Sequence, residues 1–357
     1  MKHIQSCLLH SVSTHKTRNT MELPTHTDIS NRIQCSGIPP FRLIEVQLDK
    51  VRKLIDKHLA VSAKAGDISQ LIEYMNAHSG KMLRPGLVLL AGSAIGQITY
   101  KHIRVAMIVE MIHNATLLHD DVIDDGQTRR GMPTVNKLWG NESAVILGDF
   151  LLSKVFQICS DLEPEVINII TSAAANVCEG ELRQVTQRNN WRLSEPEYID
   201  IITEKSAVFF SSCCGVGALL AQANNSQVQS LECFGLNAGI AFQITDDLLD
   251  LIGDESQTGK TAGSDVNKNK LTLAMIHLLR VVDDKDRKKV YEALNQTDEK
   301  AKAKLLKMLK HHGSLEYAHS QAQQFLDKAL SALTNLKQSH AKEALIETAK
   351  FMANRAI

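Results

Sequence analysis

Apolar residues recur at spacings of three and four from Phe41 onward, a pattern typical of amphipathic α-helices. The first run contains Leu43, Val46, Leu48, Val51, Leu54, Ile55 and Leu59. Similar runs predict helices over about 67–78, 86–97, 100–124, 143–160, 163–189, 195–222 and 227–252, with several more toward the C-terminus. Alternation of apolar and polar residues over the length of a strand is not convincing anywhere. We therefore predict an all-α fold: a single large bundle of long helices with a central cavity, in which chemistry lies between facing helices.

The first 40 residues lack this periodicity. They are rich in Ser, Thr and His and close with Pro39-Pro40, so we expect residues 1–40 to form a disordered leader. The first twenty carry Lys2, Lys16 and Arg18 without an acid, which leaves organelle targeting as an alternative, and Met21 could equally be the start. No linker interrupts the remainder, and we expect residues 41–357 to form one domain.

The amino-acid composition limits which cellular compartment and which binding partners we expect. The 357 residues include 40 Lys plus Arg and 40 Asp plus Glu, so the formal net charge is zero and a surface for nucleic acid is not expected. The 7 cysteines form no C-x-x-C or Cys/His cluster. We interpret them as buried small hydrophobic residues in a reducing, cytoplasmic compartment. The longest uncharged run, 206–231, contains too many Ser, Gly, Gln and Asn residues for a transmembrane span.

An acidic cluster, HDDVIDD at 119–125, ends the predicted 100–124 helix. Asp120 and Asp124 lie one turn apart, and like charges at that spacing destabilise a helix by about 0.2–0.5 kcal/mol. The negative end of the helix dipole adds to this, so we expect cations to compensate. A calcium-binding EF-hand loop starting at Asp121 would need Glu at its twelfth position, which is Met132, and that alternative therefore fails.

A second cluster, DDLLD at 246–250, repeats the spacing at the end of another long apolar helix. One acidic helix end is usually a solvated terminus, whereas two on helices of matching character are rarely a coincidence. Clusters dominated by carboxylates favour Mg²⁺, which completes its coordination with water and phosphate oxygens. We therefore predict a diphosphate held between the two clusters by magnesium.

Basic residues beside both clusters support this prediction, because Arg binds phosphate as a fork and Lys as a point charge. Each cation alone would be interpreted as a surface charge. Their positions beside the acidic clusters make them candidate phosphate ligands. They lie in GKMLRP at 80–85, in RRG at 129–131, and at Lys260, Lys268 and Lys270.

These segments together resemble the trans-isoprenyl diphosphate synthases, specifically the long-chain polyprenyl members that make quinone side chains. The matching segments are GKMLRP at 80–85, EMIHNATLLHDDVID at 110–124, RRG at 129–131, GDFLL at 148–152, KSA at 205–207 and FQITDDLLD at 242–250. The resemblance covers about residues 41–355. It implies the all-α isoprenoid synthase fold, a homodimer, and Mg-assisted condensation of an allylic diphosphate primer with successive isopentenyl diphosphates to a long-chain all-trans-polyprenyl diphosphate.

The resemblance also implies a role for each matching residue. Magnesium would be bound by Asp120, Asp124 and Asp246, with Asp121, Asp247 and Asp250 as further or water-mediated partners. The allylic diphosphate would be held by Arg129, Lys205 and Lys260, with Lys270 near the leaving group. Isopentenyl diphosphate would be bound by Lys81, Arg84, His113 and Arg130, although His113 could instead be a core residue. Ser206, Gln243 and the backbone carbonyl of Lys205 would stabilise the allylic cation.

Three residues depart from the family pattern: Met82 stands in place of Arg, Ser206 in place of Thr, and Asn269 in place of the Gly before Lys270. Product length depends on the helix that carries Asp120. Ala115 and Thr116 precede that residue by five and four positions, where a bulky side chain would close the cavity. Both are small, so we predict a long product and a floor set deeper, by Met111 or Ile112 and the 143–160 helix.

Two other classes share some of these features. A class I terpene cyclase has the helical bundle and the first Asp cluster, but usually carries a different second metal motif. An inactive helical subunit would have lost acids and lysines, whereas both clusters are whole here. We therefore favour the elongating synthase.

Overall fold

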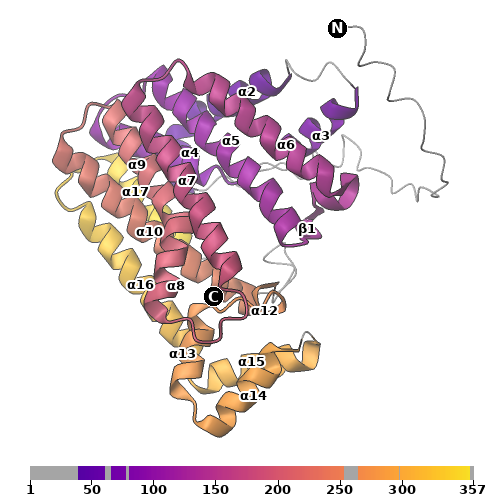
Figure 1. Cartoon of the computed structure of the whole chain (residues 1–357). Helices are drawn as coiled ribbons and strands as arrows, with labels where there is room; N and C mark the ends of the chain where they lie inside the picture. The colour runs from indigo at the N-terminus through magenta and orange to yellow at the C-terminus, as the bar shows by residue number, and fades with distance from the viewer. Residues whose placement is uncertain (1–38, 61–65, 78–79, 253–263, 297, 354–357) are drawn as a thin grey trace, which may run out of the picture. The chain divides into compact units, whose positions relative to one another are not determined.

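The computed structural model describes residues 39–60, 66–77, 80–252, 264–296 and 298–353, and these belong to one compact unit, Gly37–Ile357. Within them the fold is all-α, which confirms the predicted class (Figure 1). The N-terminal half contains η1 (Pro39–Ile44), α2 (Glu45–Ala60), α3 (Gly66–Ala77), α4 (Leu83–Ile95), α5 (Tyr100–Ile123), β1 (Thr128–Arg129), β2 (Met132–Pro133), α6 (Val135–Cys159) and α7 (Pro164–Thr186). Next come α8 (Glu195–Ile202), η2 (Thr203–Ala207), α9 (Val208–Leu220), α10 (Asn225–Ile252), α12 (Ser264–Asn267), α13 (Leu273–Val281), α14 (Asp284–Leu294), α15 (Glu299–His311), α16 (Ser314–Ala332) and α17 (His340–Ala353). The leader expected over 1–40 falls almost wholly outside the described residues and stays a prediction.

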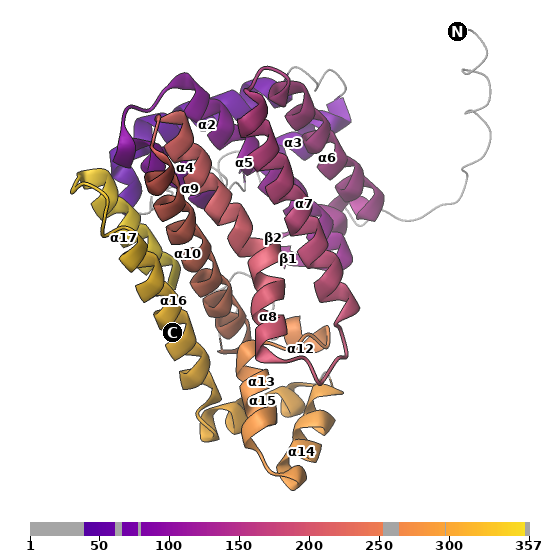
Figure 2. The ribbon, with the colours of Figure 1, turned by 60° about the vertical axis from the view of Figure 1, so that its left-hand side comes forward.

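Two long helices form the frame of the bundle. α5 packs against α4 and α6, and α10 packs along α9 and α16 (Figures 1 and 2). Buried apolar side chains of α2, α4, α5, α6, α7 and α9 form one core cluster. A second cluster joins the later part of α10 to α8 and α13. Both acidic sequence clusters therefore stand at the ends of helices whose apolar residues are fixed in the core.

The start of α5 is fixed by a buried histidine. His102 is fully buried, and its Nδ1 accepts a hydrogen bond from the Thr99 backbone N–H at 3.1 Å. Its Nε2 lies 3.1 Å from the Gly217 carbonyl oxygen of α9, to which the neutral ring donates. Thr99 thus caps α5 while His102 joins it to α9, and the 24-residue helix carries this anchor through to the acidic cluster.

Local details differ from the sequence-based expectations. The predicted 195–222 helix is α8 and α9 joined by a π-helical turn, η2. The predicted 143–160 helix starts earlier, at Val135 after the Thr134 cap, and is kinked at Gly140, whose φ is 86°. Cysteine burial was predicted wrongly at two positions: Cys159, Cys213 and Cys214 are buried, but Cys178 and Cys233 are exposed.

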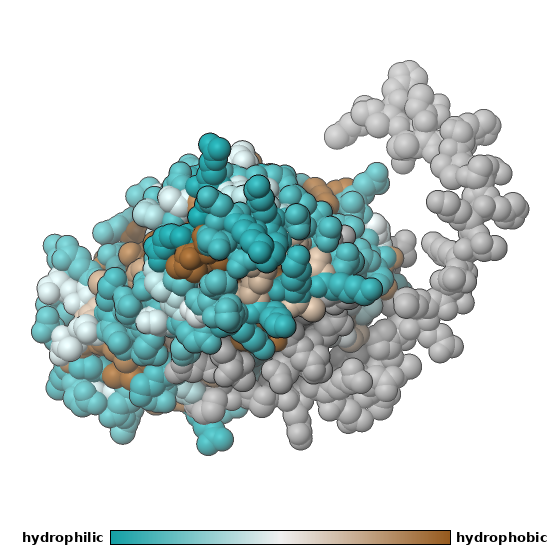
Figure 3. Space-filling view, turned by 90° about the horizontal axis from the view of Figure 1, so that it is seen from below, coloured by the Kyte–Doolittle hydropathy of each residue, from teal (hydrophilic) through white to brown (hydrophobic). Residues whose placement is uncertain are grey.

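None of the described helices is long and apolar enough to cross a membrane. Seen from the end where α14 and α15 lie, most of the described surface is hydrophilic (Figure 3).

Candidate active site

The first acidic cluster is held by an arginine that folds back onto it. The short β1–β2 hairpin pairs Arg129 with Met132 and returns Arg129 to the end of α5. Its guanidinium binds Asp121 through two atoms, with Nη2 at 2.7 Å from Oδ1 and Nε at 2.9 Å from Oδ2. Asp121 is only 7% exposed, so this fork compensates a carboxylate that water barely reaches. The cation expected beside the helix end is present.

Asp124 caps the C-terminus of α5 and receives two further cations. Arg188 Nη2 lies 2.8 Å from its Oδ1, and Lys268 Nζ lies 3.1 Å from its Oδ2. Burial alone would raise the pKa of Asp124, but Lys268, Lys205 and Arg188 together lower it below its usual value. Lys268 follows the second acidic cluster in sequence and yet contacts the first. The two clusters therefore lie at one site.

Asp120 has the opposite electrostatic balance. Burial and the negative charges of Glu181 and Asp124 raise its pKa to about 6, although Lys205 and Arg129 oppose the shift. Asp120 is half-buried, and the two carboxylates near it leave this part of the site short of positive charge.

Lys205 is positioned by a close contact between α7 and the π-helical turn. Gly180 has no side chain, and a Cβ there would lie 2.3 Å from the Lys205 backbone nitrogen. The Lys205 ammonium pairs with Glu181 and donates a hydrogen bond to Gln184 at 2.7 Å. Glycine at 180 therefore lets η2 approach α7 closely enough for two α7 side chains to hold the lysine.

The second cluster is built into a buried hydrogen-bond chain. Ser206 donates to Gln243 Oε1 at 2.8 Å, and Gln243 Nε2 donates to Asp247 at 2.9 Å. The Tyr198 hydroxyl also donates to Asp247, at 2.7 Å. Asp247 is 3% exposed, and burial raises its pKa although Lys270 opposes the shift. The chain fixes the orientation of the Ser206 and Gln243 dipoles.

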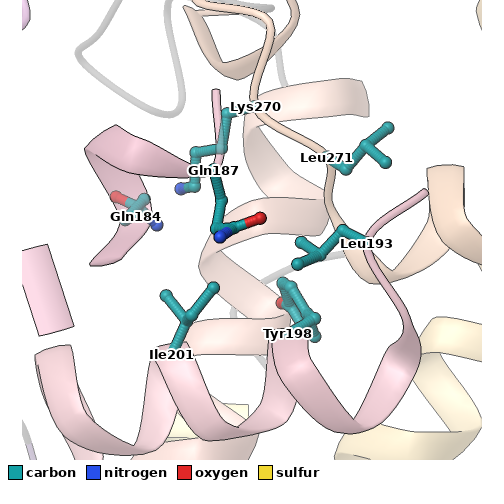
Figure 4. A pocket seen from close by; sticks show the side chains of 7 residues that line it. All are labelled: Gln184, Gln187, Leu193, Tyr198, Ile201, Lys270 and Leu271. Carbon is teal, nitrogen blue, oxygen red and sulfur yellow. The ribbon is translucent and has the colours of Figure 1, made fainter. Parts of the chain in front are cut away.

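Lys270 and Asp250 also belong to the surroundings of the second acidic cluster. Lys270 Nζ lies 3.1 Å from Asp265 and 3.6 Å from Asp247. The backbone N–H of Asp265 donates to Asp250 at 2.9 Å. Burial and the charge of Asp265 raise the pKa of Asp250 to about 7. A small pocket lies beside Lys270, lined also by Gln184, Gln187, Leu193, Tyr198, Ile201 and Leu271 (Figure 4).

Arg129 interacts electrostatically with both acidic clusters. Burial would lower its pKa, but the charges of Asp121, Asp120 and Asp246 raise it. A single guanidinium thus experiences acids from α5 and from α10. Together with the Lys268–Asp124 contact, this brings the two clusters to one site, as the sequence pattern predicts.

A second group of cations lies where the β1–β2 hairpin meets the segment before α4. The Arg130 guanidinium packs over Gly80, where a Cβ would lie 2.4 Å from Nη2. Arg84 stacks over the Phe210 ring at 4.4 Å, and Lys81 lies 4.9 Å from the Phe351 ring centroid. The GKMLRP segment and the RRG segment are therefore brought together.

Two arginines of this group, Arg84 and Arg130, lie near a buried acid. Glu110 is 2% exposed; burial raises its pKa, while the charges of Arg84, Arg130 and Arg52 oppose the shift. The α17 end lies close to the second cluster, because the Thr245 hydroxyl donates to the Ala353 carbonyl at 3.1 Å.

Three of the other predicted residues lie on α5. His113 is half-buried on α5, and Ala115 is fully buried. Thr116 is half-buried and donates its hydroxyl hydrogen to the His113 carbonyl at 2.8 Å. Lys260 lies outside the described residues, so its role stays a prediction.

The sequence reasoning missed several residues that the structure places here. Glu181, Gln184 and Arg188 follow one another at spacings of three and four and share one side of α7 and its C-terminal continuation. That spacing of polar residues on a largely apolar helix was the available signal. Tyr198 carried no such signal, because its partner Asp247 is 49 residues away.

The chain is similar to known proteins over most of its length. A family model described as polyprenyl synthetase matches residues 66–311. A short chain isoprenyl diphosphate synthase of Methanothermobacter thermautotrophicus is 34% identical over 79% of this chain and 89% of its own length. The octaprenyl diphosphate synthase of Escherichia coli is 33% identical over 81% of this chain and 90% of its own. The crystal structure of a polyprenyl synthase from Caulobacter crescentus, complexed with calcium and isoprenyl diphosphate, matches with a TM-score of 0.84 at 31% identity, covering 89% of this chain and 97% of that one.

Proposed function

The chain belongs to the polyprenyl synthetase family of prenyltransferases, and we propose that it condenses an allylic diphosphate with successive isopentenyl diphosphates to a long-chain all-trans-polyprenyl diphosphate. The observation that supports this most directly is the convergence of two partly buried carboxylate clusters and five cations, Arg129, Arg188, Lys205, Lys268 and Lys270, at one site. Such a site fits a diphosphate and its counter-ions better than it fits an uncharged substrate.

The donor set fits magnesium. Within the described residues no three His, Cys, Asp or Glu side chains form a ready-made metal group; the carboxylates pair with Lys and Arg instead. However, Asp120 and Asp250 are half-buried beside other acids, with pKa values raised to about 6 and about 7, so the site lacks positive charge. Oxygen donors of this kind suit a hard divalent cation. When bound by Asp120, Asp124 and Asp246, with Asp121, Asp247 and Asp250 as further or water-mediated partners, magnesium would neutralise charge on the leaving diphosphate.

The chain's own residues would do the remaining work. Arg129 and Lys205 already lie between the acids, where they would hold the allylic diphosphate together with Lys260, and Lys270 would lie near the leaving group. Ser206 and Gln243, fixed by Asp247, present oriented dipoles toward positive charge that develops on the allylic carbon. The Lys205 backbone carbonyl would add a third dipole.

The second group of cations suits the other substrate. Lys81, Arg84 and Arg130 lie together near the end of α17, and with His113 they would bind isopentenyl diphosphate. Glu110 lies buried among the arginines, so it would orient two guanidinium groups that otherwise repel each other. The C4 carbon of this substrate would then add to the allylic cation, and loss of a proton would complete each cycle.

Product length would be set along α5. Ala115 and Thr116 stand one turn before the acidic cluster, and neither side chain is large enough to block a growing tail. We infer a long product that serves as a quinone side chain, with a floor formed by Met111 or Ile112 and residues of α6.

We also infer a homodimer. Ile146 and Phe156 of α6 are 66% and 68% exposed, which is unusual for side chains of this size. Exposed apolar side chains on one helix suit a contact with a second copy of the chain.

One experiment tests the proposed function. Purified protein is incubated with magnesium, isopentenyl diphosphate and an allylic primer, and the products are separated by mass. A series of longer diphosphates is expected. A cyclic hydrocarbon made from the primer alone would indicate a terpene cyclase, and no turnover in a folded homodimer would indicate an inactive subunit.

A further inference from the structure

A groove lies between α2 and the start of α5, at the end of α5 opposite the acidic cluster. Its walls are Lys50, Lys53, Leu54 and Lys57 of α2 and Tyr100 and Ile103 of α5. Twenty residues of helix separate Tyr100 from Asp120, or about 30 Å at the rise of an α-helix. Figures 1 and 2 show α2 far from the β1–β2 hairpin in both views. The groove is therefore separate from the active site.

Three lysines give this groove a positive edge. Lys50, Lys53 and Lys57 are spaced by three and four residues, so they share one side of α2. All three are exposed, and none forms an ion pair or a hydrogen bond with another described residue. Two acids of α2 have other partners, since Asp49 pairs with Arg52 and Asp56 accepts a hydrogen bond from Asn76.

More cations lie near the same end of the bundle. Burial and the charges of Lys57, Arg104 and Lys154 together lower the pKa of His58. Of these, Arg104 is paired with Asp161 at 3.2 Å. Lys154 adds an ammonium from α6 to the three lysines of α2. This end of the molecule therefore favours an anionic partner.

Apolar and aromatic groups accompany the positive charge. Tyr100 is 65% exposed, and Ile103 forms a buried floor beneath it. Val46, also 65% exposed, precedes Lys50 by one turn on the same side of α2. An exposed tyrosine and valine beside lysines is the composition of surfaces that rest on the headgroup region of a bilayer. A soluble polyanion would use the lysines and leave the apolar groups without a role.

We propose that this groove docks the protein onto an anionic lipid bilayer. The choice of a bilayer rests partly on the proposed function, because a tail that starts at Asp120 and grows past Ala115 points along α5 toward Tyr100. Docking through the groove would therefore place the tail end of the bundle against hydrocarbon and keep the diphosphate end in water. The charge of the lysines and the exposed Tyr100 and Val46 support the same partner independently.

Vesicle sedimentation tests the proposal. Purified full-length protein is mixed with phosphatidylcholine vesicles that either contain or lack phosphatidylglycerol, at low and at high salt. Wild type should sediment with the anionic vesicles only, and less so at high salt. The triple variant Lys50→Gln, Lys53→Gln, Lys57→Gln should bind about a hundredfold more weakly, since each lysine near an anionic surface contributes about fivefold. Tyr100→Ser should weaken binding without changing its salt dependence.

A matched control separates this groove from general positive charge. Lys300, Lys304 and Lys307 of α15 are also exposed and spaced by four and three, so changing all three to Gln removes the same charge elsewhere. This control should bind as wild type does. Equal losses in the two triple variants, or no binding by wild type, would overturn the proposal. So would a change in oligomeric state of the α2 variant by sedimentation velocity, because the groove would then be a contact between subunits.

The elongation assay without vesicles distinguishes this inference from the proposed function. The α2 variant should make the same products as wild type there, and only wild type should turn over faster when anionic vesicles are added. Normal elongation without vesicle binding would overturn the docking surface alone. Vesicle binding by a protein that elongates nothing would support the lipid site and overturn the proposed function.

Discussion

Replacing Ala115 by Tyr should shorten the product, and the structure supplies the reason. Ala115 lies five residues before Asp120 on α5, or about 7.5 Å along the helix axis, whereas the start of α5 is about 30 Å away. A ring at position 115 would therefore leave about a quarter of the length that α5 offers. We expect the product series to collapse to the first elongation products, with Ala115→Leu giving an intermediate length.

Stability distinguishes a cavity from a packed core at this position. Ala115 is fully buried. If its side chain borders the space for the tail, a Tyr ring fits there and the Tm of the variant should stay close to that of wild type. If protein atoms already fill the space, overpacking should cost about 1–3 kcal/mol, which lowers the Tm by a few degrees.

Ala106 provides the matched control. It is also fully buried on α5, but nine residues earlier, which is about 180° around the helix. Ala106→Tyr should lower the Tm and leave the product length unchanged. The assay is mass analysis of products at saturating isopentenyl diphosphate, with Tm measured in parallel. Wild-type product length from Ala115→Tyr, or equal loss of Tm in both variants, would refute the assignment of the tail path.

Four further predictions follow from the site and the fold. Asp120→Ala or Asp246→Ala should abolish turnover with unchanged far-ultraviolet circular dichroism, and near-normal rates in both would exclude metal bridging. Arg129→Met should cost about 3–5 kcal/mol because Asp121 stays buried without its fork, and the double variant with Asp121→Asn should recover part of that loss in urea unfolding. Phe156→Asp should convert the homodimer to monomers in sedimentation velocity, and an unchanged mass would place the interface elsewhere. Burial lowers the pKa of His102 below 6.5, so the unfolded chain binds more protons just below pH 6.5 and stability should fall as pH falls through that range; Tm measured against pH should show a smaller fall in His102→Gln.

The helices and the acidic clusters were predictable because they depend on local patterns. Spacings of three and four placed α5 and α10 within a few residues of their ends, and the i, i+4 acids marked where each helix stops. The need for a cation beside Asp120 and Asp124 followed from helix electrostatics alone. The identity of those cations could not be predicted in this way, because Arg188 and Lys268 lie 64 and more residues away in sequence.

The π-helical turn η2 shows why the remaining details depend on tertiary contacts. Residues 203–207 carry an ordinary helical pattern, and the sequence alone favours one continuous helix over 195–222. The turn differs because Gly180 brings α7 against the Lys205 backbone, where Glu181 and Gln184 hold the ammonium group. Neither helix encodes that contact by itself, so the position of Lys205 follows from the pair.

Asn269, which stands in place of the family's Gly, also depends on a tertiary contact. Its φ is 53°, a left-handed conformation that glycine adopts freely and asparagine tolerates better than most residues. The Asn269 carbonyl accepts a hydrogen bond from the Asn189 backbone N–H at 3.0 Å, and Asn189 is itself left-handed with φ of 64°. Two loops are thereby joined, one carrying Arg188 and the other Lys268 and Lys270. The replacement of glycine therefore preserves the backbone that directs cations onto both acidic clusters, since Arg188 and Lys268 reach Asp124 while Lys270 reaches Asp247.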